Sequence, residues 1–239
     1  MVRKPTRKAA RSSSAAKAAA PAATGNEREK IIAAFLALLA EKPIEQIGFA
    51  EIAKEAGVSL GQLRGEFAST VAILAAHIKA IDRAVLAADL SDMAAEPPRE
   101  RLFDVLMRRL EVLAPHREAV RSLLRSARRN PPLALALNGL AVRSEQWMLT
   151  AAEINASGPR GMIRAQGLAL LFDSVLRTWV RDDDPGLART MAALDRALAR
   201  GQRFAGFLDD LRHIPSRLCR LRPRRRRRDD DAEEESAVA

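Results

Sequence analysis

Three polar residues, Gln62, Arg64 and Glu66, stand within a short segment whose apolar residues have helical spacing. The guanidinium of Arg64 is suited to a phosphate, because it presents N–H donors in a plane. A glutamate such as Glu66 can accept a hydrogen bond from the exocyclic amine of cytosine. On the second helix of a helix-turn-helix these side chains would enter the major groove, so the chemistry they predict is recognition of DNA.

The residues ahead of these side chains predict a first helix and a tight turn. Phe49, Ile52, Ala53 and Ala56 repeat at intervals of three and four residues, as one buried helix face requires. Gly57 follows where the chain must turn sharply, and glycine accepts a left-handed backbone without a side-chain clash.

The second helix has its own start signal and apolar stripe. Ser59 is suited to cap its first turn, because a serine hydroxyl can accept an otherwise unpaired backbone N–H. Leu60, Leu63 and Phe67 form the stripe, and Ser69 can cap a longer helix behind it. Any helical hairpin would satisfy the same spacing, and that alternative stays open at this point.

Composition predicts an all-helical protein of one or two domains. The chain has 239 residues, and much of its 48% hydrophobic content is alanine, which favours helices. Its single cysteine, Cys219, cannot form an internal disulfide. The most apolar stretch is interrupted by Asp173 and Arg177, and no secretory signal is recognisable, so a cytoplasmic protein is expected.

The charge is distributed unevenly along the chain. The formal net charge is +10, and residues 1–26 contain six basic residues and no acidic ones. Residues 27–74, the predicted DNA-reading unit, contain five basic and seven acidic residues. Because phosphate contacts supply much of the affinity for DNA, this unit needs help, and the basic arm is the obvious source.

Both ends of the chain lack the residues for a core. Residues 1–26 predict a disordered arm that lies along phosphates or in the minor groove, or is simply solvated; a transit peptide has the same composition. Residues 213–239 predict a second disordered tail, Arg-rich and then acidic. This tail can fold back on itself, compete with DNA for basic residues, or remain solvated.

Apolar periodicity between the tails predicts a series of helices and four regions. A helix-turn-helix domain is expected over 27–75 and a larger helical ligand-binding and dimerisation domain over 76–212. The expected helices are 27–42, the hairpin 49–67, a long helix from Ser69 through 85, then 102–113, 116–129, 133–154, 161–180, 185–200 and a weaker one near 204–211.

The segment from Arg28 to Leu74 resembles the TetR family of bacterial transcriptional regulators. The matching residues are the 28–39 helix, Ile52-Ala53, Ala56-Gly57-Val58-Ser59, Gly61, Leu63, Phe67, Ser69 and Leu74. The resemblance implies a homodimer that binds double-stranded DNA and is released from its operator by a small apolar effector, without a cofactor. It implies DNA contacts from Ser59, Leu60, Gly61, Gln62, Arg64, Ser69 and Thr70, over a core of Ile52, Ala53, Gly57, Val58, Leu63 and Phe67.

The chain departs from this family at the residues that usually touch phosphates. TetR-like proteins place a tyrosine after the leucine of the second helix and a lysine after the serine that follows. Arg64 and Thr70 stand at those positions here, and Glu66 replaces a usual histidine. A TetR fold whose DNA binding is weak, specialised or lost would show this pattern.

The departures support an alternative in which the protein holds a lipid or quinone-like ligand. The segment 176–200 is similar to the C-terminal part of TetR-like accessory proteins of ubiquinone biosynthesis, although Trp179 and Asp182–Asp184 also suit a core and a helix cap. Either function needs an apolar pocket. Its candidate lining residues, all equally suited to an ordinary core, are Phe103, Met107, Leu124, Trp147, Leu171, Phe172, Val175 and Trp179.

No catalytic or metal-binding motif is recognisable. His77, His116 and His213 are far apart in the sequence and have no metal-ligand spacing, and no nucleophile elbow or phosphate-binding glycine loop occurs. An enzyme is therefore not expected.

Overall fold

The computed structural model describes residues 21–88 and 95–212, and within these ranges the chain is all-α, as predicted, with no strand. The helices are α1 (Pro21–Glu41), α2 (Phe49–Ala56), α3 (Leu60–Glu66), α4 (Thr70–Leu86), α5 (Pro98–Leu113), α6 (Arg117–Ala127), α7 (Pro131–Ala151), α8 (Gly158–Trp179) and α9 (Ala188–Arg212). Short 3-10 turns, η1 (Ile44–Gln46) and η3 (Ala114–His116), precede α2 and α6. The predicted tail 213–239 and most of the predicted arm lie outside the described residues.

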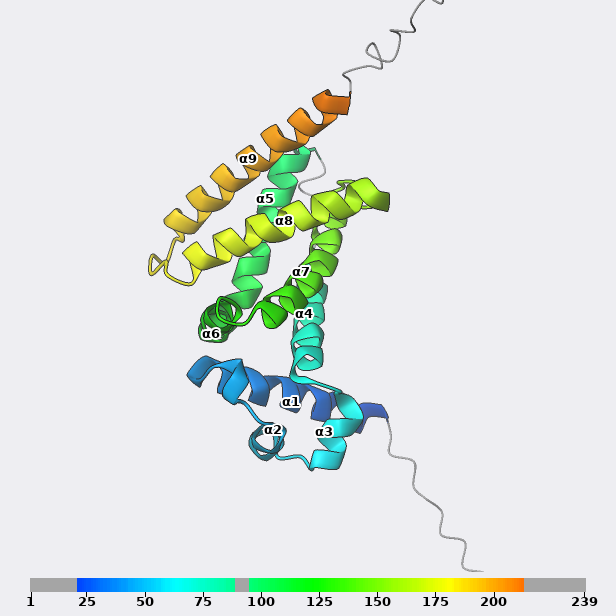
Figure 1. Cartoon of the computed structure of the whole chain (residues 1–239), viewed down its shortest axis with the longest axis vertical. Coiled ribbons are helices and arrows are strands. Elements are labelled where there is room, and N and C mark those ends of the chain that lie inside the picture. The colour runs from blue at the N-terminus through cyan, green and yellow to red at the C-terminus, as the bar shows by residue number, and fades with distance from the viewer. Residues whose placement is uncertain (1–20, 89–94, 213–239) are drawn as a thin grey trace, which may run out of the picture.

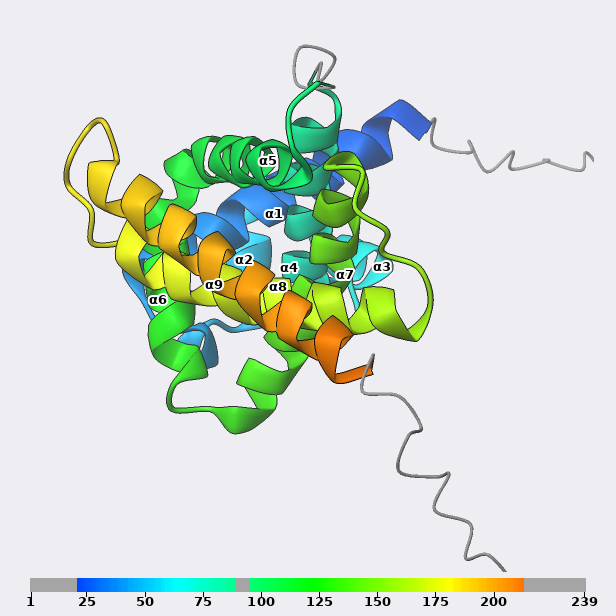
Figure 2. The ribbon, with the colours of Figure 1, turned by 90° about the horizontal axis from the view of Figure 1, so that it is seen from above.

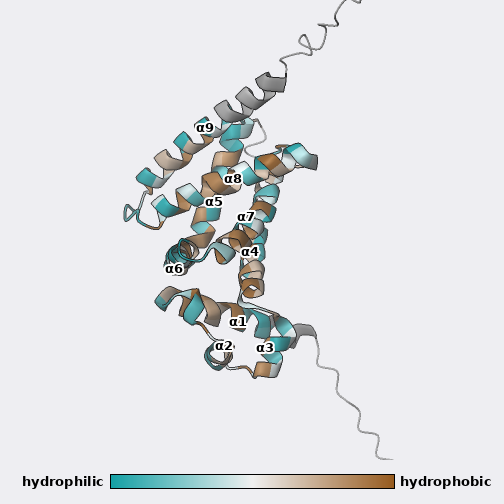
Figure 3. Cartoon of the chain, viewed as in Figure 1, coloured by the Kyte–Doolittle hydropathy of each residue, from teal (hydrophilic) through white to brown (hydrophobic). Residues whose placement is uncertain are grey.

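The helices form a small unit and a larger bundle joined by α4 (Figure 1). Helices α1 to α3 lie at one end of the molecule, and α5, α7, α8 and α9 lie at the other, with α6 between them over α1. Figure 2 shows α9 crossing over α8 when the bundle is seen from above. Hydrophobic residues gather where the helices face one another, and hydrophilic ones face outward (Figure 3).

The local signals of the helix-turn-helix are confirmed. Gly57 ends α2 in the left-handed region with φ of 64°, a backbone conformation that costs glycine nothing. Ser59 caps α3 in a reciprocal capping box with Gln62. Ile52 and Leu63, one from each helix, are buried in the core that the two helices share with α1.

Helix α4 belongs to two hydrophobic cores. Ser69 caps its first turn by accepting a hydrogen bond from the Ala72 N–H at 3.1 Å. Ile73 near its start is buried in the core of the small unit, whereas Val85 near its end is buried in the core of the bundle. The predicted division at residue 75 therefore falls inside one continuous helix.

The small unit also takes part of its core from the bundle. Ala119 of α6 and Leu133 of α7 are buried in the same cluster as the residues of α1 to α3. The hydroxyl of Ser122 on α6 donates to the carbonyl of Lys42, just after α1, at 3.1 Å. The small unit is consequently packed against the bundle, and not tethered to it by α4 alone.

Helix boundaries differ from expectation by a few residues at several ends, and three of these differences are instructive. Helix α1 begins at Pro21 instead of residue 27, and α5 begins at Pro98 instead of residue 102, since proline is tolerated in the first helical turn. Helix α9 runs without a break to Arg212, so the separate weak helix expected near 204–211 is wrong. Gly201 lies inside this helix, and an isolated glycine does not by itself end one.

Candidate functional site

The surface of α3 is the first candidate site, because its outward residues have no role in the core. Leu63 is buried, whereas Leu60 is 56% exposed and Gly61, Gln62 and Arg64 are exposed. An exposed large apolar side chain at the start of a short polar helix fits contact with a partner.

Gln62 is occupied within the protein. Its Oε1 accepts a hydrogen bond from the Ser59 N–H at 2.8 Å, and its Nε2 donates to Oε1 of Glu27 on α1 at 2.8 Å. Both ends of the amide are therefore used to hold the start of α3. In this conformation Gln62 stabilises the start of α3, and the DNA contact expected of it from the sequence stays a prediction.

Glu66 is likewise paired. Nη1 of Arg28 on α1 donates to Glu66 Oε2 at 3.2 Å, and the same guanidinium lies over the Phe67 ring at 4.4 Å from its centroid. The carboxylate is thus turned toward a cation of its own chain. This pairing removes the electrostatic objection that an acidic residue on α3 raises against DNA binding.

Arg64 remains as the exposed cation of α3; Gly61 lies one turn before it on the same side of the helix, and Gly65 follows it in sequence. Among the described residues Arg64 has no hydrogen bond or ion pair. A Cβ added at Gly65 would have no neighbour within 4 Å, and one added at Gly61 would make only an ordinary contact. Because each interior helical glycine costs about 1 kcal/mol relative to alanine, the fold itself has no use for these two.

The start of α4 is the other surface that could hold a phosphate. Ser59 and Ser69 accept hydrogen bonds as caps, and each hydroxyl still has its own proton to donate. Thr70, half-buried, is the first residue of α4, where free backbone N–H groups and the helix dipole favour an anion. The core residues predicted beneath this surface are in place: Ala53 and Phe67 are buried, and Val58 is half-buried.

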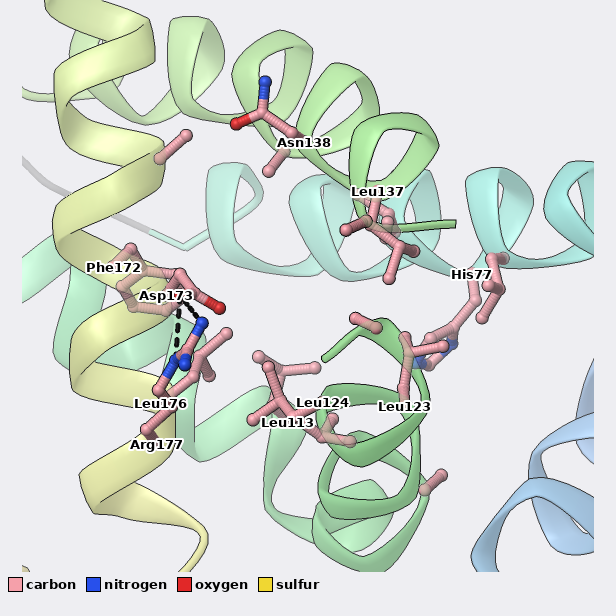
Figure 4. A pocket seen from close by; sticks show the side chains of 18 of the residues that line it. His77, Leu113, Leu123, Leu124, Leu137, Asn138, Phe172, Asp173, Leu176 and Arg177 are labelled. Carbon is pink, nitrogen blue, oxygen red and sulfur yellow. Dashed lines mark hydrogen bonds and ion pairs between the residues drawn. The ribbon is translucent and has the colours of Figure 1, made fainter. Parts of the chain in front are cut away.

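A cavity of about 360 Å³ is the second candidate site, lined by α4 to α8 with two leucines of α1 (Figure 4). Its walls are mostly aliphatic, and Leu113, Leu123, Leu124 and Leu137 surround its centre in the figure. Polar groups interrupt these walls: His77, Arg109, Arg128, Asn138, Glu145, Asp173 and Arg177. A volume of this order is typical of sites for small molecules.

His77 and His116 are brought together beside the cavity. Their rings meet edge to face with centroids 4.8 Å apart, and Nε2 of His77 is buried without a partner among the described residues. Burial lowers the pKa of His77 to about 4, with a further contribution from His116, so this imidazole is neutral at pH 7. The sequence alone gave no reason to pair these two histidines.

Solved structures share this arrangement of helices. A TetR transcriptional regulator from Nitrosomonas europaea matches with a TM-score of 0.57 and 22% identity, over 73% of this chain and 97% of that chain. One from Rhodococcus sp. RHA1 matches with a TM-score of 0.54 and 22% identity, over 75% and 97%. The chain has the TetR fold. No family model matches the sequence, and no curated protein matches it either.

The cavity of this TetR fold is lined by only two of the predicted pocket residues, Leu124 and Phe172. Trp147 is 58% exposed on the outside of α7. Val175 and Trp179 are buried on an adjacent side of α8 in the bundle core, against which Phe103, Met107 and Leu171 pack. Sequence periodicity shows which helix face is apolar, but not which neighbouring helix that face meets.

Neither a metal site nor a membrane span is found in the described part of this TetR fold. Within residues 21–88 and 95–212, no three His, Cys, Asp or Glu residues are placed to hold a metal ion. No helix in these ranges is long and apolar enough to cross a membrane. The similar solved structures are described as transcriptional regulators, not as enzymes.

Proposed function

We propose that the protein is a cytoplasmic DNA-binding transcriptional regulator, a repressor that a small apolar effector releases from its operator. The observation that carries this proposal is the outer face of α3. Arg64 is exposed on it beside two glycines that the fold does not need, Gly61 and Gly65, so the helix backbone is open to close approach by a partner. A DNA groove is such a partner, and the solved structures of like fold are described as regulators.

Residues 27–74 contain more acidic than basic residues, so the proposed regulator needs phosphate contacts from other groups. The ion pairs Arg28–Glu66 and Lys42–Glu51 neutralise two of its acidic residues internally. The start of α4 supplies N–H groups, and the basic residues of 1–20 supply charge. This combination favours a DNA-binding regulator in spite of the unusual residues Arg64 and Thr70.

Effector release is supported by the course of α4. Helix α4 begins shortly after α3 ends. Further along α4, the side chains of Leu74, His77 and Ile78 line the cavity. A ligand that pushes on these side chains changes the position of α4, and α4 carries α3 with it. Such coupling requires that the ligand bind the two positions with different affinity.

A homodimer is the expected assembly, because two reading heads are needed for an operator with two half-sites. Large apolar side chains are exposed on the bundle: Leu135 and Trp147 on α7, Met162, Ile163 and Leu170 on α8, and Met191 on α9. Sedimentation velocity tests this assembly. The wild type should sediment as a dimer, and Ile163→Glu should shift it toward the monomer if α8 lies in the interface.

The lipid-holding alternative has no observation of its own. Trp179 is buried in the core, and Oδ2 of Asp182 accepts from the N–H and hydroxyl of Thr190 at 2.8 and 2.6 Å, which holds the start of α9. These residues of the resembling segment therefore have structural roles. We do not propose this function.

The test is binding of the purified protein to the DNA beside its own gene, measured against salt concentration. A regulator should prefer that DNA over an unrelated fragment, and its affinity should fall steeply with salt. Arg64→Ala should weaken binding, whereas Arg181→Ala, which removes an exposed arginine after α8, should not. Binding without sequence preference, or equal effects of the two variants, would contradict the proposal.

A further inference from the structure

Three charged side chains meet inside the bundle, and their charges do not balance. Nη1 of Arg109 on α5 donates to Oε1 of Glu145 on α7 at 2.7 Å, and its Nη2 lies 3.8 Å from Oδ1 of Asp82 on α4. The Ser144 hydroxyl also donates to Asp82 Oδ1, at 2.5 Å. All are buried, so one guanidinium serves two carboxylates in a region of low dielectric.

Two atoms of this cluster have no hydrogen-bond partner among the described residues: Nε of Arg109, whose guanidinium lies over the Phe172 ring, and one oxygen of Glu145. Glu145 is 1% exposed and lines the cavity, and the oxygen without a partner is Oε2. A buried acceptor without a partner is destabilising, and more so when it is charged. Glu145 Oε2 therefore lacks a donor, and the two carboxylates together lack one positive charge, at the wall of the cavity.

The other charged and titratable groups that line the cavity do not supply this charge. Nε of Arg177 donates to Oδ2 of Asp173 at 2.9 Å, one turn away on the same helix, so these two satisfy each other, as Figure 4 shows. Arg128 is exposed to solvent at the end of α6. His77 is neutral, because burial lowers its pKa to about 4.

We propose that the cavity binds amphiphilic cations, molecules with an apolar body and an ammonium group that donates to Glu145 Oε2. The aliphatic wall of Leu113, Leu123, Leu124 and Leu137 receives the body, and the ammonium completes the buried cluster. Such cations would be the effectors of the proposed regulator. Their role as effectors rests on the proposed function, whereas their binding to the cavity does not.

The two other classes of amphiphile fit less well. An anionic head group would place a third negative charge beside Glu145 and Asp82, and Nε is the one nitrogen of Arg109 that pairs with neither carboxylate in the described part of the chain. A neutral alcohol could donate to Oε2 but would leave the charge unbalanced. Burial raises the pKa of Glu145 to about 7, so in the empty cavity a proton occupies this site much of the time, and a cation displaces it.

The experiment compares octylammonium, octanol and octanoate, which share a chain and differ in head group, by titration calorimetry on the full chain without DNA. A charge-assisted hydrogen bond exceeds a neutral one by about 1.4 kcal/mol, so octylammonium should bind about tenfold more tightly than octanol. Glu145→Gln should abolish that preference. Asp173→Asn, the same carboxyl-to-amide change at a paired position of the wall, should alter it less than about threefold.

The pH gives a second readout on the unaltered protein, in case Glu145→Gln does not fold. The preference for octylammonium over octanol should rise about tenfold from pH 6 to pH 8, as Glu145 loses its proton. Tightest binding of octanoate, no binding of any of the three probes, a preference independent of pH, or equal loss in both variants would overturn the proposal. Because DNA is absent, these results are independent of whether the protein regulates transcription.

Discussion

Nη1 of Arg28 on α1 lies 3.2 Å from Oε2 of Glu66 at the end of α3, so this ion pair links the two helices. The pair is partly exposed, so its direct contribution to folding is under about 1 kcal/mol. Its larger effect is on DNA binding, because Arg28 neutralises a carboxylate on α3, the helix that we expect to enter a DNA groove. Arg28 also rests on the Phe67 ring, which fixes the guanidinium in place.

Removal of Arg28 should therefore harm DNA binding more than stability. We expect Arg28→Ala to lower the unfolding free energy by about 1 kcal/mol and to weaken operator binding about tenfold, since Glu66 then faces the phosphates unpaired. The double variant Arg28→Ala with Glu66→Gln should recover most of the lost affinity. Chemical denaturation and fluorescence anisotropy measure the two quantities; a double variant as weak as the single one would show that Arg28 itself contacts DNA.

The substitution Gly65→Ala should make the protein more stable and weaken its binding to DNA. Gly65→Ala should raise the unfolding free energy by about 0.5–1 kcal/mol, because alanine is the better helix former and its Cβ meets no neighbour. The same methyl should weaken DNA binding if α3 approaches the groove closely. Gly139→Ala on α7, also exposed and without a neighbour within 4 Å, is the matched control: it should stabilise equally and leave DNA binding unchanged.

Glu145 should make stability depend on pH. Burial raises its pKa from 4.5 to about 7, so the folded state binds a proton that the unfolded state has lost over that interval. Its contribution to stability is then fully present below pH 4.5 and falls as pH rises to about 7, by about 3 kcal/mol. Unfolding of the wild type and of Glu145→Gln in urea, from pH 4.5 to 8, measures this: the stability of the variant relative to the wild type should rise with pH. A constant difference would contradict the pKa shift.

His77 should make stability depend on pH in the opposite direction to Glu145. Its pKa falls from 6.5 to about 4, so the unfolded state binds the proton more readily, and stability decreases as pH falls through this interval. A neutral replacement, His77→Gln, should lose less stability than the wild type between pH 6.5 and 4, as judged by melting temperature. Equal acid sensitivity of the two proteins would assign the effect to other groups. The comparison by variant is essential, because the contributions of His77 and Glu145 partly cancel in the wild type.

Deletion of residues 1–20 should flatten the salt dependence of DNA binding. This segment carries six basic residues and ends before α1 begins, so the described helices stay intact. Each lost phosphate contact should reduce the slope of log affinity against log salt by about 0.9. An unchanged slope would show that the segment takes no part in binding.

The elements that the sequence predicts well are those set by neighbouring residues. Gly57 and Ser59 define the turn and the start of α3 through their own backbone and hydroxyl chemistry, and both predictions are confirmed. The sequence could not predict the hydrogen bond between Gln62 and Glu27, because the two residues are 35 positions apart, beyond the reach of any local pattern. The same holds for Glu66 and Arg28.

The sequence predicts that an apolar pocket exists, but not which residues line it. An apolar pocket follows from long amphipathic helices, but its lining depends on how each helix is rotated against its neighbours. Val175 and Trp179 lie only one and two turns from Phe172 on α8, yet they face the core instead of the cavity. The unbalanced cluster of Asp82, Arg109 and Glu145 comes from three helices, and none of the three residues was singled out in the sequence.

The shared core around α4 has a practical consequence for protein engineers who exchange DNA-binding heads between regulators. A cut at residue 75 would sever a helix and strip Ala119 and Leu133 from the apolar cluster they complete. A chimera joined there would expose that cluster and aggregate or unfold. A graft that retains specificity would instead transplant the outward residues of α3 alone, and leave every buried contact between head and bundle as it is.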